Sequence, residues 1–298
     1  MCWSKGMPWN EDGHYSVCHE RMPWDSRTPT HVLVHTELSR LYGTHASFGD
    51  QRDEREALYE QAKHDLDADA AWAIVREAIS EEIIDQLADQ IDRLNPADRL
   101  FIVIPHPAFE EGVAERQDPA LGPTNAIPII FGHYLAERLA CEVDNEITQI
   151  ARVGRTNLNR FQRFLWQPCF EGDVQPGTHY IIVDDVVTLG ASFAALRSHI
   201  VRQGGSVCAV TALAHKDGRN QQFPITSGTI EAVRTLYGSR IDPFWQEAIG
   251  HDVEALTEAE GLFLRQWGRD CLSAGTGAGE PLLYRLRDRL DQAAAGKG

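Results

Sequence analysis

Residues His179 to Ala195 read HYIIVDDVVTLGASFAA, and this stretch decides the fold. Its first part, Tyr180 to Val183, is an apolar run rich in β-branched residues, which is typical of a strand buried on both faces of a parallel sheet. Two acids follow, Asp184 and Asp185, and then a turn of small residues from Thr188 to Ser192 that opens an amphipathic helix. This order predicts a strand-turn-helix unit with polar groups gathered where the strand ends.

The turn from Thr188 to Ser192 can hold a phosphate group. Its backbone N–H groups, its two hydroxyls and the start of the helix converge on one point, and a helix N-terminus favours an anion. Gly190 lets the backbone approach the anion because it has no side chain. Asp184 and Asp185 would repel a phosphate, so they need adjacent hydroxyls or a divalent cation as partners. A ribose 5-phosphate offers the hydroxyls and the phosphate together. The alternative is an ordinary turn with a Thr or Ser cap and two solvated aspartates.

The segment IIVDDVVTLGAS resembles the signature with which type I phosphoribosyltransferases bind 5-phosphoribosyl 1-pyrophosphate (PRPP). The shared pattern is an apolar run, two acids, two apolar residues and a Thr-Thr-Gly-like loop. Leu189 departs from it, since a second Thr or another small residue is usual there. The resemblance implies that Asp184 and Asp185 bind the ribose. It implies that the following residues bind the substrate: Val187, Thr188, Leu189, Gly190, Ala191 and Ser192.

The same resemblance implies an α/β fold with a Rossmann-like, mostly parallel sheet flanked by helices, and with N-terminal and C-terminal helical additions. Two further apolar runs, Leu100 to Ile104 and Val207 to Leu213, predict buried strands of that sheet. Ligands of open α/β sheets lie beyond the carboxyl ends of the strands. The residues after these strands, Pro105-His106 and His215-Lys216, should therefore face the same crevice as Asp184.

The resemblance gives these flanking residues roles. The loop after the earlier strand holds pyrophosphate in the family, which makes Pro105 and His106 substrate-binding candidates; an ordinary turn histidine is the alternative for His106. The family's common form has Lys or Arg followed by Gly, and the Pro-x-Pro form here is more similar to the ComF-like branch. Lys216 resembles the lysine that contacts the base oxygen in 6-oxopurine members. Those enzymes carry Asp at the place of Thr188, which disfavours hypoxanthine or guanine.

An arginine-rich segment stands out from the acidic chain. Between Arg152 and Arg163 there are four arginines and no acid. Expulsion of pyrophosphate needs cationic donors over the departing phosphates, and the family carries a flexible catalytic loop at this place. Arg155 and Arg160 are therefore catalytic candidates beside Asp184 and Asp185. A surface loop that balances charge is the alternative, and the sequence does not say which arginine acts.

Composition narrows the class of protein. The net charge of -16 over 298 residues argues against a nonspecific nucleic-acid or anionic-membrane surface. Six cysteines without a Cys-x-x-Cys pair predict reduced thiols rather than a zinc module or a disulfide framework. No apolar run is long enough to span a bilayer, and the start of the chain lacks a secretion signal. We therefore expect a cytoplasmic protein that contacts no membrane.

Three regions are expected: an N-terminal arm and amphipathic helix layer (1–98), a phosphoribosyltransferase-like core (99–219) and a C-terminal helical region (220–298). Apolar residues recur at three- and four-residue spacing over 69–94, which predicts a helix. That helix would either cover the sheet or form a homodimer interface. The remaining predicted elements are strands at 31–36 and 145–150 and helices at 125–139, 193–202, 229–237, 243–249, 257–267 and 280–295.

The implied activity is that of a glycosyltransferase of nucleotide metabolism. A phosphoribosyltransferase transfers ribose 5-phosphate from PRPP to a nitrogenous base and releases pyrophosphate. Mg2+ is the implied cofactor, and Asp184 and Asp185 would reach it indirectly, through the ribose hydroxyls or water. The acceptor base is not identified by the sequence. Two alternatives are a non-catalytic sensor that binds PRPP or a nucleotide, and a ComF-like accessory protein.

Overall fold

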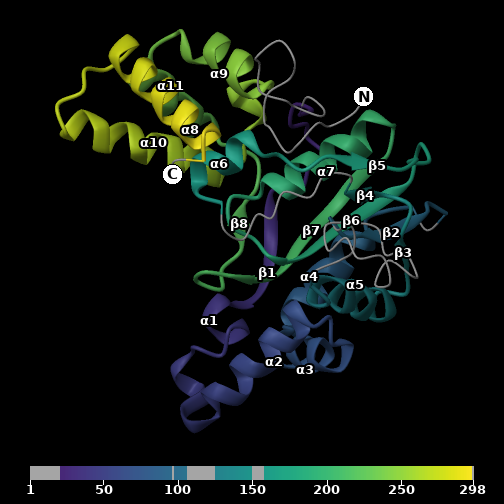
Figure 1. The fold of residues 1–298 in the computed structure, drawn as a ribbon. Coiled ribbons are helices and arrows are strands. Elements are labelled where there is room, and N and C mark those ends of the chain that lie inside the picture. Colours follow the sequence, from purple (N-terminus) through teal and green to yellow (C-terminus); the bar gives the residue numbers. More distant parts are fainter. Residues whose placement is uncertain (1–20, 96, 106–124, 150–157, 297–298) are drawn as a thin grey trace.

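The computed structural model describes residues 21–95, 97–105, 125–149 and 158–296. At its centre lies a six-stranded sheet with the order β3-β2-β6-β7-β1-β8 (Figure 1). Neighbouring strands from β3 to β1 are parallel, and β8 pairs antiparallel with β1 at one edge. The predicted α/β class with a mostly parallel sheet is confirmed. The strands are β1 (His31–Glu37), β2 (Leu100–Val103), β3 (Glu142–Asp144), β4 (Thr148–Gln149), β5 (Phe170–Glu171), β6 (His179–Val186), β7 (Ser206–His215) and β8 (Gln221–Gln222).

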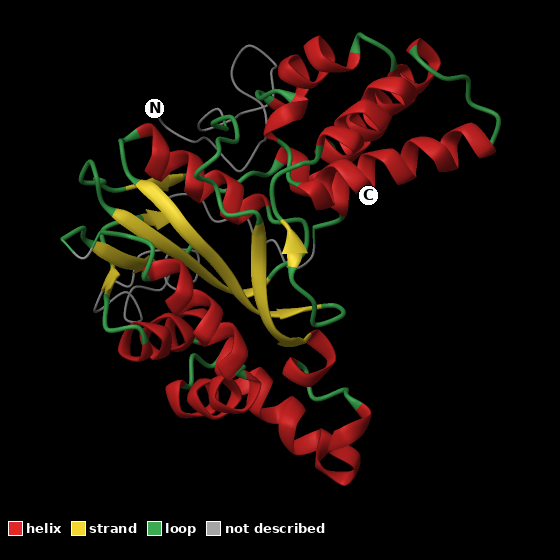
Figure 2. Ribbon diagram, turned by 180° about the vertical axis from the view of Figure 1, so that it is seen from behind, coloured by secondary structure: helices red, strands yellow, loops and turns green. Residues whose placement is uncertain are grey.

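Helices flank the sheet on two sides, as the view from behind also shows (Figure 2). Most of the predicted helices are found within a few residues of their expected ends. The helices are α1 (Leu38–Leu41), α2 (Arg52–His64), α3 (Ala68–Ala78), α4 (Glu81–Ile91), α5 (Ile127–Arg138), α6 (Arg160–Leu165), α7 (Ala191–Arg202), α8 (Ser227–Tyr237), α9 (Ile241–Ile249), α10 (Glu258–Ser273) and α11 (Glu280–Ala294), with 3-10 turns η1 (Ala46–Gln51) and η3 (Val253–Ala255).

The continuous helix expected over 69–94 is wrong. The chain leaves the helical conformation at Ile79, whose ψ is 141°, and α3 and α4 lie on either side of the break. The backbone N–H of Ser80 donates to Nδ1 of His35 in β1 at 3.0 Å. This contact stabilises the extended conformation at the break. The strand expected over 145–150 is shorter in the structure, where β4 covers Thr148–Gln149 and residue 150 lies outside the described residues.

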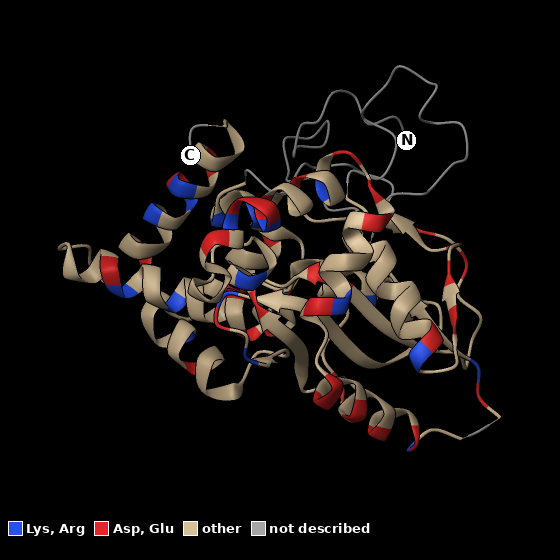
Figure 3. Cartoon of the chain, turned by 90° about the horizontal axis from the view of Figure 1, so that it is seen from below, with Lys and Arg blue, Asp and Glu red and all other residues tan. Residues whose placement is uncertain are grey.

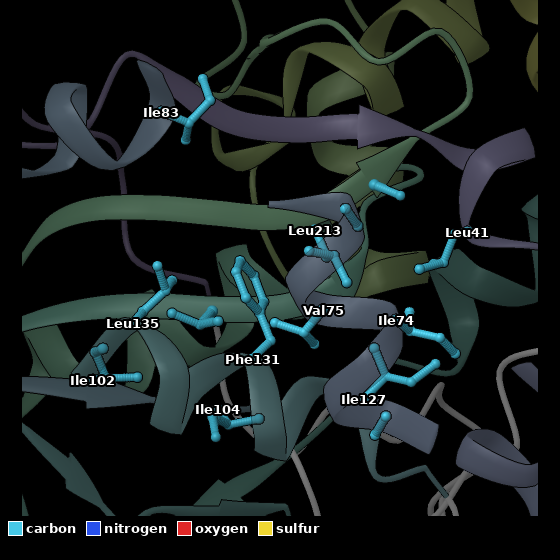
Figure 4. Close-up of a cluster of buried hydrophobic side chains, with 14 of the residues drawn as sticks. Leu41, Ile74, Val75, Ile83, Ile102, Ile104, Ile127, Phe131, Leu135 and Leu213 are labelled. Carbon is cyan, nitrogen blue, oxygen red and sulfur yellow. The ribbon is translucent and has the colours of Figure 1, made fainter. Parts of the chain in front are cut away.

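The central strand β6 is buried on both faces, as its apolar run predicted. Ile181 and Val183 belong to a core that α2, α3, α4 and α5 complete on one face. Figure 4 shows part of that core. Tyr180 and Ile182 point to the other face, where they join side chains of α7 such as Phe193. Burial of each aliphatic side chain contributes about 1.5–3 kcal/mol to the stability of the fold. The two cores therefore hold β6, and with it the acid pair at its carboxyl end, in place.

The segments on either side of the expected core region also help to build it. β1 pairs with β7 inside the sheet, so residues before 99 contribute a central strand. The apolar faces of α3 and α4 pack into the core beneath the sheet. Of the two interpretations of the 69–94 segment, covering the sheet is therefore the one observed.

The C-terminal helices form a separate apolar cluster with α6. Its largest fully buried side chain is Trp245. Both acidic and basic residues lie on the helices near the C-terminus in the view of Figure 3. Surface pairs such as Arg287–Glu247, at 3.1 Å, belong to this pattern. The region is thus a packed helical unit with a mixed-charge surface.

One buried ion pair ties the N-terminal arm to this helical unit. Arg21 contacts both carboxylate oxygens of Glu260 in α10, at 2.6 and 2.9 Å, and both side chains are about 1% exposed. The same carboxylate accepts the backbone N–H of Thr257 at 2.9 Å. The arm therefore contributes a buried cation to the start of α10.

The expectation that all cysteines are reduced thiols is wrong for Cys169, which is disulfide-bonded. Cys141, Cys208 and Cys271 carry free thiols. Burial raises the pKa of Cys208 to about 12, so its thiol stays protonated and behaves as an apolar group. Within the described part of the chain, no helix is both long enough and apolar enough to cross a bilayer.

Two buried histidines should make the fold sensitive to acid. Burial lowers the pKa of His35 to about 4 and that of His251 to about 3. An unfolded chain binds these protons near pH 6.5, about the ordinary value. The free energy of unfolding should therefore fall below pH 6.5, by up to about 1.4 kcal/mol per pH unit for each histidine. Urea unfolding between pH 6.5 and 4.5 measures this slope. His35→Gln should make it shallower, and an unchanged slope would contradict the assignment of His35.

Candidate functional site

The two acids of the signature lie half-buried at the carboxyl end of β6. One carboxylate oxygen of Asp185 accepts the side-chain amide of Asn125 at 2.6 Å, and the other accepts the backbone N–H of Val186 at 2.8 Å. An oxygen of Asp184 accepts the backbone N–H of Asp185 at 2.8 Å. These bonds orient the Asp185 carboxylate at the edge of the sheet where parallel strands place ligands.

Asn125 is a site residue that the sequence analysis missed. It precedes α5, and its side-chain oxygen accepts the backbone N–H of Ile127 at 3.0 Å while its amide holds Asp185. An Asn before a helix signals a cap. That signal identifies only the bond to the helix, because the partner Asp185 is distant in the sequence. Asn125 thus links the start of α5 to the acid pair.

The turn between β6 and α7 opens the helix without a side-chain cap. Its N-cap is Gly190, with φ +76°, and among the described residues no side-chain cap bond is made there. The alternative of a Thr or Ser cap is therefore wrong. The first N–H groups of a helix have no acceptor within it, so an anion at the turn would meet donors. Thr188 is exposed and Ser192 is half-buried at this end.

The departure at Leu189 has a structural reason. Its side chain is buried, at 8% exposure. Its carbonyl oxygen accepts the hydroxyl of Thr257 at 2.5 Å. Phe223 also lies close to the turn, with a ring carbon 3.7 Å from the place where a Cβ on Gly190 would stand. The C-terminal region thus supports the turn from behind, while Val187 is fixed to β7 through its N–H bond to Ala214, at 3.1 Å.

Gly190→Ala should perturb both stability and ligand binding. A side chain at this positive φ costs about 1–2 kcal/mol, and the new Cβ would lie 3.3 Å from a methyl group of Thr257. Gly177 is a matched control, with φ +80° and nothing within 4 Å of its added Cβ. We expect both variants to lose unfolding free energy in urea titrations, with the larger loss in Gly190→Ala. Equal losses would show that the contact with Thr257 has no effect.

The arginine segment reaches the turn through α6. Arg163 donates from Nη1 to the hydroxyl of Thr188 at 2.9 Å. The guanidinium of Arg160 lies over the ring of Phe263, at 5.3 Å from its centroid. Burial and the neighbouring Arg160 lower the pKa of Arg163, while Tyr42 acts to raise it. Arg152 and the candidate Arg155 lie outside the described residues.

Two tyrosines from the N-terminal helices stand near the acid pair. The rings of Tyr42 and Tyr59 meet edge to face with centroids 4.7 Å apart, and Lys63 donates to the Tyr59 hydroxyl at 2.6 Å. Burial is the main cause that raises the pKa of both tyrosines, and the charge of Asp185 adds to it. No sequence motif marks these two tyrosines, because the residues around Tyr42 have loop composition. The N-terminal layer therefore borders the site.

The remaining sequence candidates occupy different settings. Pro105 is buried just after β2, and His106 lies outside the described residues. Lys216 is exposed in the turn after β7. Its neighbour His215 contacts the carboxylate of Asp217 at 2.7 Å. The carboxyl ends of β6, β7 and β1 lie together, since Val186 pairs with Ala214 and His215 pairs with Glu37.

The described residues at this edge of the sheet do not form a complete metal site by themselves. Across the described ranges, no group of three or more His, Cys, Asp or Glu side chains is arranged to hold a metal ion. Asp184 and Asp185 supply carboxylate oxygens, which suit Mg2+, and Mg2+ usually keeps several waters or substrate oxygens as ligands. The donor set therefore fits an ion that is bound mainly through a substrate.

Comparison with known proteins gives two partial relatives. No protein-family model matches the chain. Protein TraN of Escherichia coli is 33% identical over 210 residues, and an uncharacterized protein of Haemophilus influenzae is 29% identical over 146 residues. The matches cover 70% and 49% of this chain, and 43% and 29% of the two relatives. The chain thus spans less than half the length of these curated relatives.

Solved structures that resemble the chain include phosphoribosyltransferases. Adenine phosphoribosyltransferase from Thermoanaerobacter pseudethanolicus matches with 18% identity and a TM-score of 0.29, over 49% of this chain and 72% of that one. Hypoxanthine phosphoribosyl transferase from Trypanosoma cruzi matches with 14% identity and a TM-score of 0.28, over 51% and 68%. Likenesses this low carry no weight in assigning a family or an activity, so the assignment depends on the site.

Proposed function

We propose that the chain binds PRPP at the carboxyl end of β6 and transfers its ribose 5-phosphate to a nitrogenous base. One observation carries this proposal: the acid pair lies shortly before a turn in which Gly190 is the N-cap of α7, and no side chain of the described residues caps that helix. Carboxylates suit the ribose hydroxyls, and uncapped helix N–H groups suit the 5-phosphate. The same sugar phosphate satisfies both groups at once.

In the proposed reaction a base nitrogen attacks C1 of PRPP. The new C1–N bond forms as the C1–O bond to pyrophosphate breaks, and the bonding pair leaves with the pyrophosphate. Asp184 and Asp185 hold the ribose so that C1 faces the base, and arginines of the 152–163 segment stabilise the leaving group. Mg2+ neutralises charge on the pyrophosphate when bound, and Asp184 and Asp185 would hold it through ribose hydroxyls or water.

A pyrophosphate-release assay tests the activity. The protein is incubated with PRPP, Mg2+ and a panel of purine, pyrimidine and amine acceptors. The proposal predicts release with at least one acceptor, and none without protein. PRPP should also raise the melting temperature, because a ligand that binds only the folded state stabilises it. Absence of both effects would overturn the proposal.

A second candidate is a non-catalytic PRPP sensor. The observation that favours it is the bond between Thr257 and the carbonyl of Leu189, which connects the turn to the C-terminal helices. A phosphate on the turn would then act directly on that helical region. Thermal stabilisation by PRPP without pyrophosphate release with any acceptor would select the sensor. The likeness to the ComF-like branch rests on the Pro-x-Pro turn that begins at Pro105 and on the helix that follows Asn125, and it stays a proposal.

A further inference from the structure

Arg163 reaches the first hydroxyl of the turn that follows the acid pair. Its Nη1 lies 2.9 Å from the Thr188 oxygen, and Thr188 itself is exposed. The Arg163 side chain is half-buried. The contact brings a cation from a different part of the chain to the place where the turn would hold an anion.

The structure holds Arg163 in this position through α6. Asn159 and Gln162 form a capping box at the start of that helix. Nε of Arg163 donates to the carbonyl of Leu158 at 3.2 Å. Phe164 and Leu165 anchor the helix in the C-terminal apolar cluster. The bond to Leu158 and the burial of Phe164 and Leu165 therefore restrict the positions that the Arg163 guanidinium can adopt.

The electrostatic setting favours a doubly charged anion over a neutral group. Arg160 lies near enough to lower the pKa of Arg163, so two positive charges stand on one short helix. Arginine presents five N–H donors in a plane that matches a phosphate, and it stays charged when partly buried. Contact with Thr188 and a bond to a phosphate oxygen are compatible in that geometry.

We propose that Arg163 is a ligand of the 5-phosphate of the sugar and not of the pyrophosphate. The 5-phosphate would lie between the turn and α6, and its charge would be recognised by the guanidinium together with backbone N–H groups. This inference rests on the proposed function, because it concerns the same turn. It assigns the cation to the end of PRPP opposite the leaving group.

Calorimetric titration with ribose 5-phosphate tests the proposal, since this ligand lacks pyrophosphate. Arg163→Gln should weaken binding by about 10- to 100-fold, the usual effect of losing a hydrogen bond to a charged group. Arg163→Lys should retain part of the affinity. Arg289→Gln is the matched control: it removes the same charge beside α6, where Arg289 lies 5.2 Å over the ring of Phe161. It should leave the affinity within about twofold, the effect of a surface charge.

A phosphorus NMR titration provides a second readout that a merely structural role would not move. The second pKa of a phosphate monoester is about 6, and a bound guanidinium should lower it in the wild-type complex. The shift should be smaller in Arg163→Gln and partly restored in Arg163→Lys. Wild-type affinity and an unchanged phosphate pKa in Arg163→Gln would overturn this proposal alone. Failure of the wild-type protein to bind either ribose 5-phosphate or PRPP would overturn the proposed function with it.

Discussion

Asp185→Asn should reduce PRPP affinity by about 100-fold or more. The neutral amide removes a charged acceptor for the ribose hydroxyls, and each hydrogen bond to a charged group contributes about 1.5–3 kcal/mol. It also disturbs the bond that Asn125 donates to Asp185 at 2.6 Å. Calorimetric titration with PRPP and Mg2+ measures the loss. Because the side chain is half-buried at the end of the strand, the fold should be retained.

Asp98→Asn is the control for this experiment. Asp98 accepts from His179 at 3.1 Å, at the amino end of β6, and so lies at the opposite end of the same strand. Its substitution should leave PRPP affinity within about twofold, as expected for an exposed pair. Wild-type affinity in Asp185→Asn would remove the acid pair from the site. A similar loss in Asp98→Asn would mean that the effect of Asp185 is indirect.

Glu260→Ala should cause the largest loss of stability, about 3–5 kcal/mol. Removal of one partner of a buried ion pair leaves the other as an uncompensated buried charge. The Arg21 side chain is about 1% exposed, and it also contacts Gln167 at 3.0 Å and the carbonyl of Ala255 at 3.3 Å. These neutral groups do not replace the carboxylate. The free energy of unfolding in urea measures the effect.

Glu247→Ala serves as the matched control, because Glu247 pairs with Arg287 on the exposed surface of the same helical unit. Exposed pairs contribute about 0–1 kcal/mol. Equal losses of unfolding free energy in the two variants would show that the buried pair stabilises the fold no more than the exposed one. Burial acts to raise the pKa of Glu260, but Arg21 and the bonds to the carboxylate outweigh it, so the pKa is lowered. The contribution of the pair should therefore be fully present above about pH 4.3, the unfolded-state pKa, and be lost as the pH falls from there through the lower folded-state pKa.

The Glu260 variant also probes the connection between the arm and the turn. Glu260 holds the backbone of Thr257, and the Thr257 hydroxyl holds the carbonyl of Leu189. The three contacts form one chain from Arg21 to the proposed phosphate turn. Loss of Glu260 should therefore loosen the support behind the turn.

The strands of the sheet could be predicted because their sequences carry the signal of burial. β2, β6 and β7 each contain an apolar run, which predicts a buried strand, and all three lie near their expected ends. The turn after β6 was also readable, since Gly190 and its neighbours are adjacent in the sequence. Local chemistry was sufficient for these elements.

Other features depend on contacts between distant residues. The break at Ile79 is stabilised by His35 from a strand far earlier in the chain. The buried pair of Arg21 and Glu260 joins residues 239 positions apart. Neither contact leaves a periodic pattern in the sequence, because none of these residues belongs to a motif in its own segment. For the same reason the contribution of Asn125 to the acid pair could not be predicted.

The arginine segment could be predicted only in part. Its excess of positive charge was visible in the sequence, but the choice among its arginines was not. We propose Arg163, because a helix anchored in the C-terminal region brings it into contact with Thr188. That region has no motif of its own, and its role at the turn appears only through packing.

A crystal structure of the protein with PRPP and Mg2+ would show whether the sugar phosphate binds at the carboxyl end of β6. We predict that the 5-phosphate lies within hydrogen-bond distance of the backbone N–H groups between Thr188 and Ser192. We also predict the 2- and 3-hydroxyls of the ribose on the carboxylates of Asp184 and Asp185. PRPP bound elsewhere, or bound at this edge with both carboxylates turned away from the ribose, would contradict this prediction.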